Sequence, residues 1–212
     1  MAGEKHTVSA FDDELRALRA MILELGDRAS KAIGEAIAAL EARDAEEARR
    51  VAKADAEIDR IAARAESAAV SIIARRAPMA DDLRGVVAAI KMSALLERTA
   101  DYAKNIARRV PSITAKYPGE LRAMVHEMTG EARGMLEDVV RAYADSDVAL
   151  AHRVCERDDI VDDLHDRLTQ GLIEFMIEKP ERIGQAAHLL FVSKHLERIG
   201  DQATNIAEMI TY

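Results

Sequence analysis

Glutamate, aspartate and asparagine recur at one spacing in two nearly identical stretches of this 212-residue chain. The stretches are LERTADYAKNIA at 96–107 and LERIGDQATNIA at 196–207, which agree at eight of twelve positions. Oxygen atoms of these residue types are the ligands that Mg²⁺, Ca²⁺, Mn²⁺ or oxidised iron prefer. The repeat therefore predicts two equivalent metal-binding rows: Glu97, Asp101 and Asn105 in the first copy, and Glu197, Asp201 and Asn205 in the second.

Each row occupies one side of a helix, because residues i, i+4 and i+8 lie above one another. In the second copy, apolar residues that recur every three or four positions predict the core-facing seam. They are Leu189, Val192, Leu196, Ile199, Ala203, Ile206 and Ile210. Glu197 follows Leu196 directly, so the polar row lies roughly 100° around the helix from the seam. We expect the rows at the flank of a bundle.

A single helix cannot surround a cation, so further ligands must come from neighbouring helices. Two acidic pairs at i, i+4 are candidates, with helix-surface charge as the equally favoured interpretation: Asp55 with Asp59, and Asp158 with Asp162. Carboxylates at this spacing repel by about 0.2–0.5 kcal/mol. Lysines beside each row, Lys104 and Lys194, can offset that repulsion.

Six long helical segments must position these residues. The apolar periodicity predicts them from near Ser9 to Arg43, at 44–75, at 81–109, at about 120–145, at 147–178, and from Pro180 nearly to Tyr212. The segment VPSITAKYPG at 110–119 carries two prolines and a glycine. Residues of the second helix recur 103 positions later in the fifth. The chain is therefore predicted to be all-α, with two tandem pseudo-symmetric three-helix bundles at 1–110 and 120–212 and a linker at 111–119.

Composition excludes several classes of protein. The formal charge is −8 and no basic stripe is present, which argues against nucleic-acid binding. A single Cys155 cannot form an internal disulfide and is compatible with a reducing compartment. No apolar run approaches the ~20 residues of a membrane span, and the N-terminus shows no secretory signal. We expect a cytoplasmic protein that reaches the membrane only through partners.

The two motif copies resemble the duplicated E(D)xxxD motif of the PhoU family of bacterial phosphate-signalling regulators. FDDELRALRAMI near the start, AIAALEARD and VAKADAEID in the first half, PMADDLRGVVAAIK before the first motif, and HLLFVSKHLERIGDQATNIAEMITY at the end resemble the same family. One departure is Thr99-Ala100, where the family usually has Ile-Gly, as at Ile199-Gly200. Alanine narrows local access there but leaves every oxygen ligand in place.

The resemblance implies multinuclear sites for iron, zinc, magnesium or manganese, with Glu97, Asp101, Glu197 and Asp201 as principal ligands and the two asparagines in support. It also implies an adaptor between the ATPase subunit of the Pst phosphate transporter and the phosphate-sensing histidine kinase. Such a protein keeps phosphate uptake and the phosphate-starvation response off when phosphate is plentiful. We also expect a homodimer.

An enzyme is not expected. A ferritin-like di-iron site needs Glu-x-x-His pairs, and the sequence contains none. It also lacks a glycine-rich phosphate loop. The alternative that remains open is a metal-free helical scaffold whose acidic rows dock a basic partner surface.

Overall fold

The periodic apolar residues form long helices throughout residues 2–211, which the computed structural model describes with side chains from residue 10 onwards. The α-helices are α1 (Ala2–Ala42), α2 (Ala45–Arg76), α3 (Ala80–Arg109), α4 (Gly119–Asp145), α5 (Val148–Cys155), α6 (Asp158–Glu178) and α7 (Ile183–Thr211). Two short 3-10 helices, Val110–Ser112 and Pro180–Arg182, precede the turns into α4 and α7. The predicted all-α fold with six long helical segments is confirmed, α5 and α6 together forming the fifth.

Two details of the helix boundaries differ from the prediction. The first helix begins at Ala2, so the predicted start near Ser9 is wrong. The fifth segment is interrupted at Glu156–Arg157, although neither proline nor glycine occurs there. The interruption coincides with ion pairs from Arg157 to α4, where its guanidinium lies 2.9 Å from Glu131 and 2.8 Å from Asp138. The break therefore coincides with contacts between two helices, which the apolar periodicity within one helix does not predict.

The turns α1–α2 and α4–α5 are copies of one another. Arg43 and Ser146, 103 positions apart, both adopt a left-handed conformation with φ of 56° and 54°. An aspartate follows each of them and caps the next helix. Asp44 accepts hydrogen bonds of 3.0 Å from the backbone N–H groups of Glu46 and Glu47, and Asp147 accepts one of 2.9 Å from Leu150. The repeated sequence thus builds the same helical hairpin twice.

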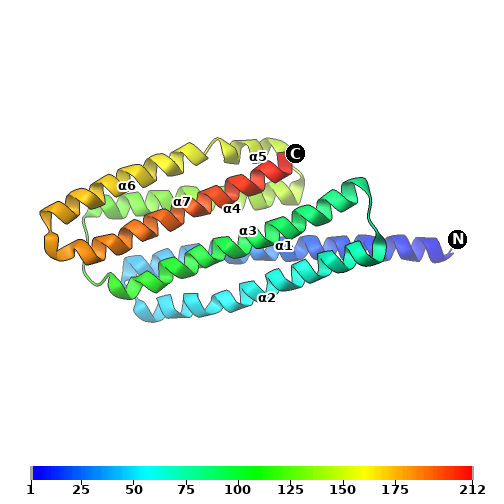
Figure 1. Cartoon of the computed structure of the whole chain (residues 1–212), viewed down its shortest axis with the longest axis horizontal. Helices are drawn as coiled ribbons and strands as arrows, with labels where there is room; N and C mark the ends of the chain where they lie inside the picture. The colour runs from blue at the N-terminus through cyan, green and yellow to red at the C-terminus, as the bar shows by residue number, and fades with distance from the viewer. Residues whose placement is uncertain (1, 212) are drawn as a thin grey trace.

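The helices form four layers (Figure 1). The outer layers are α2 on one side and α5 with α6 on the other, and the inner layers are α1 with α3 and α4 with α7. Within each half the three helical segments pack on one another, and the halves meet through α1 against α4 and α3 against α7. No helix of the described residues is long and apolar enough to cross a membrane.

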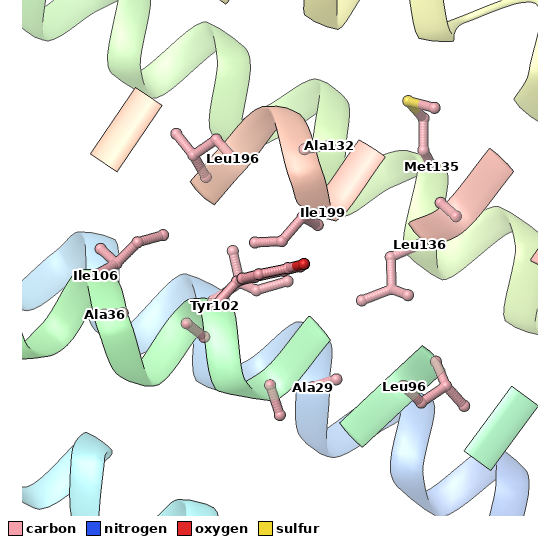
Figure 2. Packing of buried hydrophobic residues seen from close by; sticks show 14 of the residues in the cluster. Ala29, Ala36, Leu96, Tyr102, Ile106, Ala132, Met135, Leu136, Leu196 and Ile199 are labelled. Carbon is pink, nitrogen blue, oxygen red and sulfur yellow. The ribbon is translucent and has the colours of Figure 1, made fainter. Parts of the chain in front are cut away.

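One continuous hydrophobic core runs through both halves. The predicted seam of α7 is buried from Leu189 to Ile206, and Ile210 packs partly buried at its end. At the junction of the halves, Gly26 and Gly34 of α1 leave room for Val140 and Arg133 of α4. Tyr102 of α3 lies among aliphatic side chains of the core (Figure 2). The acidic rows stand beside this core on α3 and α7.

The segment between α3 and α4 is irregular but anchored. Ile113 is fully buried, and the side-chain amide of Gln185 makes two hydrogen bonds to the backbone of Ala115. Its Nε2 donates to the carbonyl at 2.9 Å, and its Oε1 accepts from the N–H at 3.0 Å. Residues of α7 therefore fix the path of the chain between the halves.

Candidate metal centre

Four carboxylates of the first half gather between α2 and α3, and we call them the first acidic cluster: Asp55, Asp59, Glu97 and Asp101. Burial raises the pKa of Glu97, and the negative charges of the other three raise it further. The pKa of Asp59 is raised for the same reasons, burial first and Asp55 second. Because each charge disfavours its neighbours, this cluster attracts a cation.

A lysine of the same chain lies within the first cluster. Lys104 Nζ donates to Asp55 Oδ2 at 2.5 Å and also to Asp101 Oδ1. It thereby links α2 to α3 across the cluster. The Asp55 side chain is 7% exposed and that of Lys104 is 17% exposed, so this ion pair is largely removed from water. The second oxygen of Asp55, Oδ1, is buried and has no hydrogen-bond partner.

The equivalent residues of the second half form the second acidic cluster, between α6 and α7: Asp158, Asp162, Glu197 and Asp201. Burial raises the pKa of Asp201, and the charges of Glu197, Asp158 and Asp162 raise it further. Burial also raises the pKa of Asp162, with Asp158 and Glu197 adding to the effect. The structure thus brings the predicted ligands of two helices together in both halves.

The second cluster has a different cation partner. Lys194 Nζ lies 2.5 Å from Glu197, one turn away on the same helix, and its side chain remains 45% exposed. The position that corresponds to Lys104 is Thr204, whose hydroxyl donates to Asp158 Oδ1 at 3.1 Å. A neutral hydroxyl therefore bridges α6 and α7 where an ammonium bridges α2 and α3.

The two asparagines of the rows lie on the same helices as the clusters but do not contact the cluster carboxylates through hydrogen bonds among the described residues. Asn105 is half-buried and Asn205 is exposed. Both continue the rows by helical spacing. Their supporting ligand role stays a prediction.

The ligand atoms of the two clusters favour some of the metals that the family resemblance implies over others. All eight carboxylates supply hard oxygen ligands, which suit magnesium, manganese or oxidised iron better than soft metals. As the side chains lie, however, no three His, Cys, Asp or Glu groups of residues 10–211 converge closely enough to hold an ion. The second cluster has no lysine between its two helices and fits a cation once exposed Asp162 turns toward the three partly buried carboxylates. The first does not fit while Lys104 lies between Asp55 and Asp101.

Comparison with known proteins decides the family. The PhoU domain model matches residues 22–110 and again residues 125–210. The chain belongs to the PhoU family. Each matched range contains one acidic cluster, so both clusters are parts of a PhoU domain.

Relatives of the PhoU family match nearly the whole chain. The phosphate-specific transport system accessory protein PhoU homolog of Zymomonas mobilis is 45% identical over 98% of this chain and 87% of its own length. The homolog of the same name from Caulobacter vibrioides is 40% identical over 98% of this chain and 91% of its own. The crystal structure of PhoU from Pseudomonas aeruginosa superposes with a TM-score of 0.90 at 31% identity, covering 95% of this chain and 97% of that one.

Sequence reasoning identified all the cluster carboxylates but missed how they are bridged. Lys104 was expected only to offset repulsion along its own helix, whereas its contact with Asp55 on α2 joins two helices. The signal was present in the motif copies, because position 104 is Lys where position 204 is Thr. Interpreting it required the register of α2 on α3, which spacing within one helix does not provide.

Proposed function

We propose that this protein is a non-enzymatic regulator of phosphate transport. It acts as a negative regulator of phosphate uptake and of the phosphate-starvation response, as an adaptor between the ATPase subunit of the Pst transporter and the phosphate-sensing histidine kinase. Membership of the PhoU family supports this proposal, together with near full-length relatives named phosphate-specific transport system accessory proteins. The protein works at the inner face of the membrane through these partners.

The metal is the second part of the proposal. A divalent or trivalent cation binds to carboxylates of the acidic clusters and pulls two neighbouring helices together, changing the side face offered to a partner. The observation that supports it is the gathering of four carboxylates from two helices in each half, where burial and the neighbouring charges raise the pKa of Glu97 in the first cluster and of Asp201 in the second. Bringing such groups together without a cation costs free energy, which cation binding recovers.

A metal-free scaffold is the alternative function, and one observation favours it. Lys104 and Lys194 already pair with cluster carboxylates, so each cluster is compensated in part by the chain itself. In this case the exposed acids, such as Asp59 and Asp162, contact a basic surface of the partner. That contact weakens steeply with salt and is indifferent to chelator.

The experiment combines a deletion strain with purified components. Deletion of the gene is expected to raise phosphate-starvation reporter activity in phosphate-rich medium, and the wild-type gene is expected to restore repression. Capture of the ATPase subunit and of the kinase is then measured with metal, with chelator and across a salt series. Loss on chelation supports the metal-dependent adaptor, and loss only with salt supports the scaffold. An unchanged reporter in the deletion strain contradicts the regulatory proposal.

A further inference from the structure

The two acidic clusters are equivalent in sequence position but unequal in charge. Lys104 pairs with Asp55 and Asp101 from two helices in the first cluster, and its side chain is only 17% exposed. Lys194 pairs with Glu197 alone in the second cluster, on its own helix, and is 45% exposed. Lys194 has a single contact and can turn to solvent when a cation replaces it at Glu197, whose own side chain is only 14% exposed, whereas Lys104 would have to break two contacts to leave its cluster.

The surroundings of Lys104 are basic as well. A hollow of about 120 Å³ lies beside Asp55 and Lys104, and its wall includes Arg28, Lys31 and Arg50. Glu35 is the acid that shares this wall with Asp55. Arg28 and Arg50 are themselves paired with Glu24 and Glu47, so Lys104 is the cation that competes most directly with a metal in this cluster.

We propose, on the basis of the metal-binding function above, that Lys104 is a built-in counter-ion that keeps metal out of the first acidic cluster, so that the second cluster alone takes a cation. Three differences distinguish the clusters. The first cluster has Lys104 where the second has Thr204, its lysine bridges two helices whereas Lys194 contacts one residue, and its lysine is 17% exposed whereas Lys194 is 45% exposed. Each cluster also contains one buried carboxylate oxygen without a hydrogen-bond partner, Asp55 Oδ1 in the first and Glu197 Oε2 in the second, so the bridging lysine is what sets the two apart.

The two copies of the motif then have different roles. The first half uses its repeat of the motif as a fixed link between α2 and α3, independent of metal supply. The second half retains a cation-dependent link between α6 and α7. Metal availability then alters one side of the molecule and leaves the other unchanged, which gives a partner a means to distinguish the two halves.

Reciprocal exchange of the two residues tests the proposal. Protein stripped with chelator is dialysed against Mn²⁺, and bound ions are counted per chain. Wild type is expected to bind about one Mn²⁺, Lys104→Thr about two, and Thr204→Lys to bind at least roughly tenfold more weakly, since an added ammonium beside Asp158 repels the ion. Lys91→Thr, an exposed lysine of the same helix, is the matched control and leaves binding unchanged.

Two further variants locate the ion and guard against misfolding. Lys104→Thr combined with Asp101→Asn is expected to lose the added ion, which places it in the first cluster. Lys104→Gln removes the charge but can still donate a hydrogen bond to Asp55, so it replaces Lys104→Thr if the latter does not fold by circular dichroism. Lys104→Thr and Lys104→Gln both retain Ala100. An additional bound ion in either variant is therefore due to the loss of the Lys104 charge and not to the difference between Ala100 and Gly200.

The outcomes separate this inference from the proposed function. Wild type that binds two ions, or a folded Lys104 variant that gains none, overturns the role of Lys104. Wild type that binds none while Lys104→Thr gains one upholds the role of Lys104 and removes the metal from the second cluster.

Discussion

At the scale of single residues, the chemistry of this protein depends on carboxylates held close to one another. Asp201 lies near Glu197, Asp158 and Asp162, and burial together with those charges raises its pKa above the usual value of an aspartate. A folded-state pKa above the unfolded one means that the ionised group opposes folding once the pH exceeds both values. The cluster is therefore strained electrostatically at neutral pH without a cation.

Asp201→Asn should consequently stabilise the chelated protein at neutral pH, by about 0.5 kcal/mol for a partly exposed group. The gain should shrink as the pH falls, because the raised pKa lets wild-type Asp201 take up a proton earlier than an unfolded aspartate and lose the same charge. Urea unfolding in chelator at pH 7 and pH 4 measures it. Asp163→Asn, an exposed position of α6, is the control. If Asp201→Asn is less stable than wild type in chelator at pH 7, Asp201 is not repelled by the other carboxylates of the second cluster.

His195 predicts a second dependence on pH. It stacks on Tyr102 with ring centroids 5.7 Å apart, and burial, aided by Arg109 and Arg198, lowers its pKa to about 4. In the unfolded chain His195 takes up a proton near pH 6.5, whereas in the folded protein it does so only near pH 4. The folded state therefore loses stability as the pH falls from about 6.5 to about 4.

The first half has Leu95 at the position of His195, which suggests the variant. His195→Leu should lose less stability than wild type between pH 7 and pH 4, by up to about 3 kcal/mol. Melting curves at several pH values measure the difference. If the stability of the two proteins fell equally with pH, a partly buried and neutral His195 between α3 and α7 would be contradicted.

At the scale of helices, the break between α5 and α6 distinguishes the halves. The guanidinium of Arg157 reaches Glu131 and Asp138 on α4 and lies against Gly134, where a Cβ atom would meet it at 2.8 Å. The corresponding residue of α2 is Ala54, and α2 continues without a break. The interruption comes directly before Asp158, the first carboxylate of the second cluster.

Arg157→Ala should destabilise the protein by about 1–2 kcal/mol, because it removes two partly buried ion pairs and leaves Glu131 without a partner, while Asp138 keeps its ion pair with Arg141. It should also weaken Mn²⁺ binding, since Asp158 loses the turn that positions it. Chemical denaturation and dialysis measure the two effects. Arg153→Ala on the exposed side of α5 should change neither. If Arg153→Ala had the same effect as Arg157→Ala, the Arg157 contacts at the break would not be what positions Asp158.

The helices and the oxygen rows were predictable because both depend on spacing within one segment. The seam of α7 and the aspartate caps at Asp44 and Asp147 follow from local residue types. The break at Arg157 and the bridge from Lys104 to Asp55 were not predictable, since each requires the position of one helix against another. Contacts of that kind depend on packing of the whole core.

At the scale of the whole molecule, the two repeats share one core. Leu96 and Leu196 occupy equivalent positions in the two motif copies, and both are fully buried within the same cluster. The sequence predicts two bundles but does not indicate that α1 packs on α4 and α3 on α7. Such packing makes the stability of one half depend on the other.

We therefore expect a single cooperative unfolding transition. Leu96→Ala and Leu196→Ala should each destabilise that one transition by about 2–5 kcal/mol, as for other buried leucines. Calorimetry and circular dichroism measure it. Two separate transitions, with each substitution affecting only one of them, would contradict a shared core.

The metal content of protein purified without chelator or affinity tag is the decisive measurement for a cation at the duplicated carboxylates. Elemental analysis is compared among wild type, Asp101→Asn and Asp201→Asn, with a thermal melt before and after chelation. We expect metal in wild type and in Asp101→Asn, and we expect Asp201→Asn to lose both the metal and the drop in melting temperature that chelation causes. Wild type that neither carries nor acquires a cation, or Asp201→Asn that retains it, would contradict a metal site built from the duplicated carboxylates.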